Sequence, residues 1–233
     1  MTHIVHPYAH RLGIIRDWRS RWFAADKKQY RENLNVDNVI RNFLTKRLRG
    51  MHVSHVEIER NATELRILIH TARPGLVIGR SGEHATKLRA EIIRITRATA
   101  PAHNRIIKID VAEIRQPETS AAVVAYMVAE GLEKRMPFRR ILKQTAEKVM
   151  AVRDVIGVRV TVSGRLGGAD MSRKEEIKKG RIPLQTFRAN IDFAHEKAYL
   201  PYGVIGIKVW IYMGDQHADD ERVSTPRFPG HAA

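Results

Sequence analysis

Cysteine is absent from this 233-residue chain, which excludes disulfide bonds and metal sites built on thiolates. No apolar run approaches the length that crosses a bilayer, and the N-terminus lacks the apolar core of a signal peptide. The sequence also contains neither a phosphate-binding P-loop nor the Gly-x-Ser-x-Gly turn that carries a serine nucleophile. We therefore expect a cytoplasmic protein without a membrane partner, an enzymatic activity or a bound cofactor.

Acidic residues are too few to balance the basic ones, because 25 Asp and Glu stand against 41 Lys and Arg. The formal net charge is +16, and residues 1–213 alone hold +18, since residues 214–233 contain four acids and two bases. A positive field of this strength indicates a polyanion as partner. Nucleic acid is the first candidate, ahead of a membrane surface.

Eleven histidines raise the question of a metal site. His3, His6 and His10 share one face if that stretch is helical, but no glutamate completes the ligand set of a zinc-protease helix. His52 and His55 lie three apart in a predicted strand, where side chains at this spacing point to opposite faces. The sequence therefore predicts no metal site, and it offers no catalytic residue.

The chain is organised around a short loop with two glycines, Gly79-Arg80-Ser81-Gly82. An apolar turn precedes the loop, and apolar residues at helical spacing follow it, with Lys87 on the polar side of that helix. Glycine lets a nucleic-acid backbone approach the main chain, and free N–H groups at the start of the next helix then face phosphate. The KH module clamps single strands in this way, so these five residues are candidate RNA contacts.

The Gly-x-x-Gly pattern is weak evidence by itself, because two further copies occur at residues 164–167 and 203–206. The last copy has apolar middle residues inside a strand-like run and is interpreted as a packing feature. Only the loop at Gly79 lies between two predicted helices. This context favours an RNA clamp over a plain turn between helices.

Residues 37–115 are predicted to form one α+β domain. Asp37 is expected to cap a helix over residues 38–49, and alternating apolar residues predict strands over residues 53–60 and 64–71. A strand over residues 105–114 follows the two loop helices and a polar link. The order helix–strand–strand–helix–loop–helix–strand is that of a type II KH domain.

Residues 1–36 form a predicted N-terminal extension in which basic and aromatic residues alternate. One interpretation is a surface-packed segment whose aromatics cover the next domain, and Trp18 and Trp22, one helical turn apart, suit such a packing stripe. The other is an arm that stacks bases and contacts phosphates, and the sequence does not decide between them. The candidate RNA contacts in this extension are Arg11, Arg16, Arg19 and Arg21.

Residues 116–213 are predicted to form a second α+β domain, with two helices on a small sheet. The helices are expected at residues 118–135 and 138–152, and the strands at residues 157–162, 186–194 and 204–213. A glycine-rich turn at residues 163–168 leads into a basic segment, and residues 214–233 are expected to be disordered. Further candidate RNA contacts here are Arg165, Arg173, Lys174, Lys178, Lys179 and Arg181.

The helix expected at residues 138–152 has a clean division of faces. Its apolar residues cluster on one side, whereas Arg139, Arg140 and Lys143 fall within about 100° of one another on the opposite side. Only Glu147 is spaced to neutralise them. Most charged helix faces are simply solvated, but in so basic a chain this face is a candidate contact for a polyanion.

Several longer motifs resemble the bacterial form of protein three of the small ribosomal subunit, the universal KH-domain ribosomal protein of the small-subunit head. They lie at residues 70–75, which lead into the glycine loop, and at residues 162–169, 180–184, 202–206 and 208–211. They occur in the family's order, and the resemblance runs from about residue 5 to residue 213. It therefore covers nearly the whole part of the chain that is expected to be ordered.

The resemblance implies a two-domain protein that binds ribosomal RNA in the head of the small subunit. It also implies a place beside proteins four and five in the tunnel through which messenger RNA enters, with no nucleotide hydrolysis of its own. In the family, cations on a helix of the C-terminal domain touch incoming messenger RNA and help to unwind it. That motif falls on Phe138-Arg139-Arg140, with the third cation at Lys143.

The sequence departs from the family pattern at two cations. Ser81 stands where many relatives have a second basic loop residue, and Gln144 stands where another cation often follows Lys143.

Two rival functions are weighed against a ribosomal one. A lyase acting on damaged DNA needs a lysine in an apolar pocket, which is not legible here, and a free-standing KH regulator of transcripts predicts a pool outside the ribosome.

Overall fold

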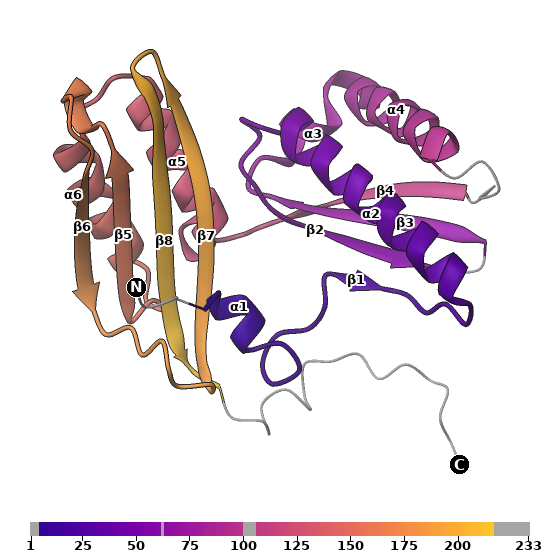
Figure 1. The fold of residues 1–233 in the computed structure, drawn as a ribbon, viewed down its shortest axis with the longest axis horizontal. Coiled ribbons are helices and arrows are strands. Elements are labelled where there is room, and N and C mark those ends of the chain that lie inside the picture. The colour runs from indigo at the N-terminus through magenta and orange to yellow at the C-terminus, as the bar shows by residue number, and fades with distance from the viewer. Residues whose placement is uncertain (1–4, 62, 100–105, 217–233) are drawn as a thin grey trace.

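The computed structural model describes residues 5–61, 63–99 and 106–216. Two α+β bodies lie side by side, each with its own four-stranded sheet (Figure 1). The predicted polar link at residues 101–104 lies outside the described residues, as does the part of the predicted disordered tail beyond residue 216. That prediction is wrong for residues 214 and 215, which belong to the strand Gly203–Asp215. No helix among the described residues combines the length and apolar composition that crossing a membrane requires.

The first body has the predicted type II KH order. Helix α2 (Lys27–Arg47) is followed by strands β2 (Val53–Arg60) and β3 (Glu64–Thr71), then by α3 (Pro74–Ile78), the glycine loop, α4 (Glu83–Thr99) and strand β4 (Ile106–Glu113). β2 and β3 are antiparallel, whereas β3 and β4 are parallel. The inward residues of the sheet meet α2 and α4 in one apolar core that includes Ile40, Ile67 and Ile92.

The start of α2 corrects the sequence prediction. The helix begins at Lys27, where the Asp26 side chain accepts a hydrogen bond from the Lys28 N–H, and not at residue 38 under an Asp37 cap. Asp37 lies inside the helix, buried, and its carboxylate pairs with Arg60 of β2. A residue that resembles a cap is thus the partner of a buried guanidinium, and the helix crosses the expected boundary between residues 36 and 37.

The second body places two helices on one face of an antiparallel sheet, as predicted. Helices α5 (Ala121–Glu133) and α6 (Phe138–Met150) cover strands in the order β6 (Arg173–Gly180), β5 (Gly157–Gly164), β8 (Gly203–Asp215) and β7 (Ala189–Leu200). The core joins apolar residues of α5 and α6 to those of β5, β7 and β8. Before α5, the residues expected to be helical form only a short 3₁₀ turn, Pro117–Thr119.

Strand β6 was not predicted, because its sequence is almost entirely charged. It is an edge strand paired only with β5 among the described strands, and every second residue is exposed. Ile177 is its single apolar residue that packs against the core. Charged side chains on an edge strand also discourage pairing with other chains, so the composition that hid this strand suits its position.

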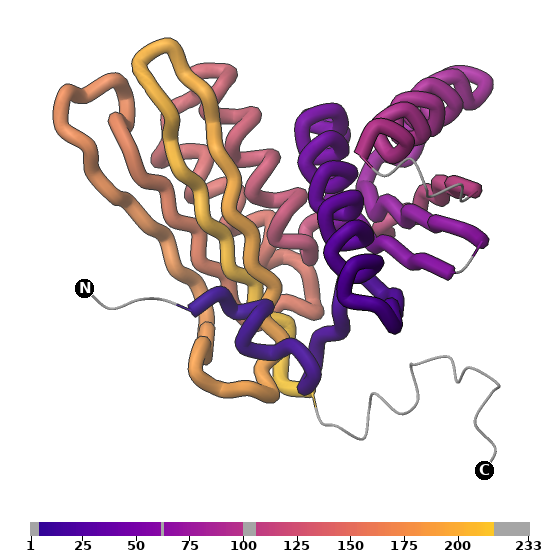
Figure 2. The backbone as a smooth tube through the Cα atoms, turned by 45° about the vertical axis from the view of Figure 1, so that its right-hand side comes forward, coloured from indigo at the N-terminus to yellow at the C-terminus, as the bar shows by residue number. Residues whose placement is uncertain are grey.

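The N-terminal segment straps the two bodies together. Helix α1 (Pro7–His10) packs against β7, and strand β1 (Ser20–Arg21) pairs in parallel with β2 of the KH sheet. Figure 1 shows this segment passing from the second sheet to the first along the lower edge of the molecule. A further contact comes from α5, which lies on its own sheet and also touches β2. Figure 2 shows the indigo N-terminal segment in front of the lower ends of the strands of the second sheet. A cleft of about 910 Å³ remains between the bodies.

Candidate nucleic-acid interface

The glycine loop has the backbone conformation that its residues were expected to allow. Gly79 (φ 75°) and Gly82 (φ 78°) both lie in the left-handed region, and Ser81 between them has φ 54°. At Gly79, a Cβ atom would come within 2.2 Å of the His84 ring. The loop therefore depends on glycine at Gly79, and a non-glycine residue with positive φ at Ser81 marks it as a locally strained turn.

The polar side chains of the loop and of the first turn of the following helix point to solvent. Arg80 and Ser81 are exposed, and Lys87 lies one turn into α4, where it faces Glu83 at 3.8 Å. Both partners of that pair are 69% exposed, so the ion pair is weak and the lysine remains available to a phosphate. The structure thus places the five residues predicted from the KH pattern on one turn and the helix start next to it.

Helix α6 exposes the three cations predicted to share a face. Ile141, Leu142, Ala146 and Val149 are buried against the sheet, whereas Arg139, Arg140 and Lys143 are exposed: the predicted division of faces is present. Among the described residues, no acid forms an ion pair with Arg140 or Lys143.

Two acids beside α6 are arranged differently from the prediction. Glu147, which the helical spacing offers to the three cations, instead accepts from Lys179 of β6 at 3.4 Å. Arg139 meets a different acid, Glu175 of β6, through two contacts of 3.4 Å. Since Arg139 is 75% exposed, its ion pair contributes little, and the face keeps most of its positive charge.

The basic segment of β6 divides between two surfaces, because successive residues of a strand point to opposite sides. Arg173 and Lys179 lie on the side of the helices, next to α6, where Arg173 and Arg139 both approach the ring of Phe138, at 5.4 Å and 5.6 Å. Lys174 and Lys178 lie on the opposite, open face of the sheet. The first pair therefore enlarges the basic surface of α6, and the second forms a separate one.

The chain matches two family models, and together they cover most of it. The KH domain matches residues 39–119, and the C-terminal domain of ribosomal protein S3 matches residues 128–211. Small ribosomal subunit protein uS3 of Shewanella denitrificans is 46% identical over 211 residues, which cover 91% of this chain and 88% of the relative. The uS3 proteins of Coxiella burnetii (45% over 214 residues; 92% and 90% covered) and Shewanella frigidimarina (47% over 211; 91% and 88%) are similarly close.

This chain belongs to the uS3 family. The predicted resemblance and the predicted α+β fold class are thereby confirmed. Members of the uS3 family are structural components of the ribosome and not enzymes, as the sequence predicted for this chain.

Arg11 must be removed from the set of uS3 residues predicted to contact RNA. Its side chain is fully buried. The guanidinium donates to five backbone carbonyls: Ala189 at 2.6 Å, Thr186 at 2.9 Å, Pro7 and Leu184 at 3.0 Å, and Pro183 at 3.5 Å. Arg11 therefore satisfies the backbone of a loop that precedes β7, and no phosphate can reach it.

The other N-terminal cations have protein partners as well, although they are not fully buried. Arg16 donates to the Asn190 side chain at 2.7 Å, and the Arg19 guanidinium lies 4.5 Å from the centre of the Tyr8 ring. Arg21 pairs with Asp17 at 2.9 Å and with acids of β2. These contacts favour a strapping role for the segment, and RNA contact by these three residues stays a prediction.

Some aromatic residues of the N-terminal segment pack inside the protein, and others are exposed. Trp22 packs against Tyr30, with ring centres 5.2 Å apart, and donates its indole N–H to Asp37 at 2.7 Å. Trp18 and Phe23 are 63% and 88% exposed. The packing interpretation is thus confirmed for Trp22, although the helical stripe with Trp18 is wrong, because β1 separates the two tryptophans. Base stacking by Trp18 and Phe23 stays a prediction.

Arg165 holds the glycine-rich turn in place. Its guanidinium donates to the carbonyls of Ala169 (2.9 Å) and Tyr202 (3.2 Å) and faces the Asp170 carboxylate at 3.3 Å. The turn is thereby fixed to the hairpin between β7 and β8. Arg181, by contrast, is exposed and forms no ion pair with another described residue, so it remains a candidate RNA contact.

Sequence reasoning missed Lys208 as a member of the open-face surface. Lys208 is the only charged residue between apolar neighbours in β8, and it is exposed beside Thr161 of β5. Lys208 shares that face with Lys174 and Lys178, with Arg159 of β5 and with Lys197 of β7. Glu176 of β6 lies on the same face and pairs with Arg159 and Lys174. The lone lysine in an apolar strand was the available signal.

Proposed function

We propose that this chain is a structural constituent of the small ribosomal subunit, as the names of its relatives state for them. In this proposal it binds ribosomal RNA in the head of the subunit, beside neighbouring head proteins. The exposed face of α6 lines the path by which messenger RNA enters, where it guides the strand and helps to open its structure.

The observation that carries the messenger RNA part of the proposal is the position of the exposed cations on α6. Arg139 and Arg140 occupy the first turn of this helix, and that turn contains no acidic residue. There the positive end of the helix dipole disfavours each cation by about 0.3–1 kcal/mol. A sequence that keeps two arginines at an unfavourable position, exposed and away from the core, is suited to bring an external anion to that position.

Ribosomal RNA binding is assigned to the glycine loop and to the exposed cations of β6. Gly82 leaves room for a sugar-phosphate backbone at the start of α4, since no atom lies within 4 Å of the position that its Cβ would take, and Arg80 and Lys87 supply charge beside it. Because Ser81 replaces a second cation, we expect the loop to bind through geometry more than through charge. The cations on the two sides of β6 add contacts that do not depend on sequence.

Translation of structured messages tests the proposed role of α6. Ribosomes carrying the Arg139→Ala, Arg140→Ala, Lys143→Ala triple variant are expected to slow at stable hairpins and to keep near-normal speed on unstructured messages. The matched control replaces Lys27, Lys28 and Arg31, which have the same spacing in the first turns of α2 and are also exposed. Equal slowing on both kinds of message, or slowing in the control alone, contradicts the proposal.

The affinity for ribosomal RNA, measured together with thermal stability, tests the glycine loop separately. Arg80→Asp combined with Ser81→Asp places carboxylates where phosphate is expected, and both side chains are exposed, so the fold should persist. We expect weaker binding to ribosomal RNA at an unchanged thermal midpoint. A loss of stability as large as that of a core truncation, roughly 2–5 kcal/mol, would show that the loop is structural instead.

A further inference from the structure

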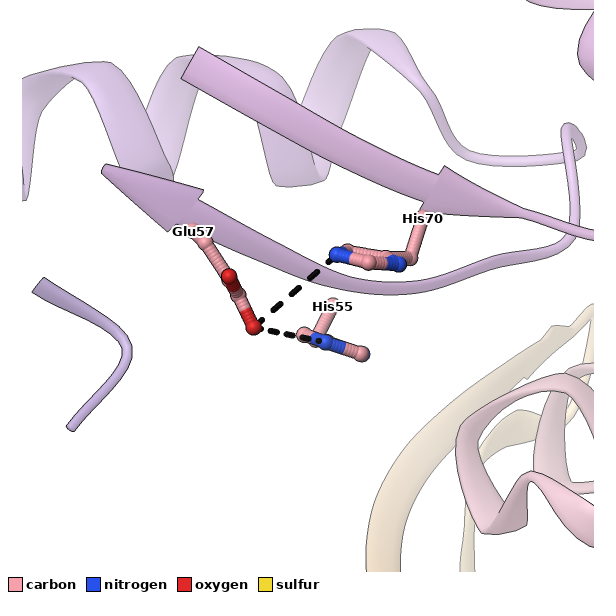
Figure 3. A group of neighbouring side chains, drawn as sticks. All are labelled: His55, Glu57 and His70. Atoms are coloured by element: carbon pink, nitrogen blue, oxygen red, sulfur yellow. Dashed lines mark ion pairs between the residues drawn. The ribbon is translucent and has the colours of Figure 1, made fainter. Parts of the chain in front are cut away.

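Three side chains with metal-ligand chemistry meet on the outer face of the KH sheet, the face turned away from α2 and α4. His55 and Glu57 are two residues apart on β2 and therefore point to the same side. His70 of β3 is the direct cross-strand partner of His55. Figure 3 shows the two imidazoles lying side by side with the Glu57 carboxylate at their edge.

The distances among the three groups are short enough for one small cation. One carboxylate oxygen of Glu57, Oε1, lies 3.3 Å from the His55 Nε2 atom and 3.9 Å from the His70 Nε2 atom. One ligand atom from each residue lies within 4.8 Å of the other two. The His70 Nε2 atom is buried and has no hydrogen-bond partner among the described residues. A buried nitrogen without a partner, aimed at a carboxylate, is the feature that calls for an explanation.

Neighbouring groups orient two of the three candidate ligands. The Ser54 hydroxyl lies 3.1 Å from the His55 Nδ1 atom, which leaves Nε2 directed at Glu57. Arg21 lies 3.5 Å from Oε2 of Glu57, so that Oε1 is the oxygen left to the histidines. Partners of this kind, one atom behind the ligand, fix the tautomer and orientation of residues in metal sites.

Arginines near this cluster have neutral partners, so their positive charges remain, and the Glu57 carboxylate must offset them when a cation binds. Arg41 donates to the carbonyls of Val56 and Arg19, at 2.7 Å and 2.9 Å. Arg19 lies over the Tyr8 ring, and Arg16 donates to the Asn190 side chain.

We propose that His55, Glu57 and His70 form a site for one Zn²⁺ ion, with the fourth position open to the cleft between the two bodies. Two imidazoles and one carboxylate are a ligand set that suits zinc, and three protein ligands leave one tetrahedral position for water. The proposal departs from the prediction of no metal, because that prediction compared His55 with His52 and not with the cross-strand His70.

Binding requires the two imidazoles to leave their present arrangement. Their planes are nearly parallel, 11° apart, with ring centres at 4.2 Å. Lone pairs of parallel rings do not converge, so each ring must turn about its Cβ–Cγ bond to reach a zinc–nitrogen distance of about 2.0–2.1 Å. The strands themselves need not move, since the cluster is open towards the cleft.

Zinc competition on the full-length chain tests the proposal. The protein is freed of metal with a chelator and titrated with Zn²⁺ near pH 7 in the presence of a chromophoric zinc indicator. We expect the wild-type chain to withdraw one equivalent of zinc that both Glu57→Gln and His55→Gln fail to withdraw. His195→Gln is the matched control, because it removes an exposed histidine and should retain that equivalent.

Cobalt and thermal stability supply two independent measurements. Co²⁺ bound by these ligands should give the visible absorption of a tetrahedral site in the wild-type and His195→Gln chains only. Zinc should raise the thermal midpoint of the same two chains, because it binds the folded state alone. Equal zinc uptake by all four chains, or no zinc held against the indicator by the wild type, overturns the proposal. Circular dichroism of the isosteric Glu57→Gln variant verifies that its fold is intact.

Discussion

The N-terminal segment and helix α6 are both rich in basic residues, yet their cations face in opposite directions. Arg11 is fully buried and donates to backbone carbonyls, and Arg16 and Arg19 have protein partners at short distance. Arg140 and Lys143 of α6 are exposed and have no acidic partner among the described residues. The two regions cannot be distinguished by composition, but one uses its charge inside the protein and the other presents it outside.

This difference separates cations that stabilise the fold from cations that are available to RNA. A buried guanidinium is retained because the carbonyls around it would otherwise lack donors, and such unsatisfied groups are costly. An exposed cation contributes little to the free energy of folding, and it contributes to the free energy of binding when the protein contacts a polyanion. Substitutions in the two regions should therefore change different measurements.

The largest effect is expected from Arg11→Met, which keeps an apolar chain of similar length and removes the donors. Several buried carbonyls, those of Ala189, Leu184 and Thr186 among them, lose their partner, so we expect a loss of about 3 kcal/mol in the free energy of unfolding. Urea denaturation provides the measurement. Arg140→Met is the control and should stay within about 0.5 kcal/mol of the wild type. Equal stability of the two variants would remove the distinction between the regions.

A histidine extends the comparison to pH. Burial lowers the pKa of His52, with Arg73 adding to the effect, so the unfolded chain takes up a proton that the folded chain resists. Stability is then fully present above the unfolded value of 6.5 and falls as the pH drops below it. The slope is at most about 1.4 kcal/mol per pH unit. His52→Asn, which tolerates the φ of 50° at this position, should flatten the dependence of the free energy of unfolding on pH, measured by urea denaturation at a series of pH values.

An intermediate effect is expected from Arg165, whose side chain is 42% exposed and still holds two carbonyls. Arg165→Ala should lower the free energy of unfolding by about 1 kcal/mol, between the values for Arg11 and Arg140. Gly167→Val should do more damage, because valine disfavours the φ of 71° found there. If the valine variant unfolds at the wild-type midpoint and assembles normally into ribosomal particles, the glycine has no conformational role.

The parts of the structure that the sequence predicted well are those encoded by local periodicity. The helix–loop–helix around Gly79 and the division of faces on α6 follow from spacings of three and four residues. Such patterns lie within one helix or turn, so they can be recognised without knowing which distant residues will pack against it. The same reasoning brought together Arg139, Arg140 and Lys143 before the fold was known.

The parts that the sequence did not predict depend on partners distant in the chain. Asp37 has the chemistry of a helix cap, and only the arrival of Arg60 from β2 makes it a buried acid within a helix. Arg11 is indistinguishable in sequence from an RNA-binding arginine until the loop before β7 surrounds it. His55 and His70 become neighbours through strand register, which a count of residues between histidines does not reveal.

The most direct test of RNA contact by α6 measures how the salt concentration changes the RNA affinity of the α6 triple variant. Full-length chains bind a labelled single-stranded RNA, and fluorescence anisotropy gives the affinity over a series of salt concentrations. Losing Arg139, Arg140 and Lys143 should flatten the slope of log affinity against log salt by about 2, at roughly 0.7 per phosphate contact, with the free energy of unfolding unchanged. The Lys27, Lys28, Arg31 control has the same charge and spacing and should keep nearly the wild-type slope. An equal change of slope in both triple variants, or none in the α6 variant, would contradict the claim that α6 presents its cations to RNA.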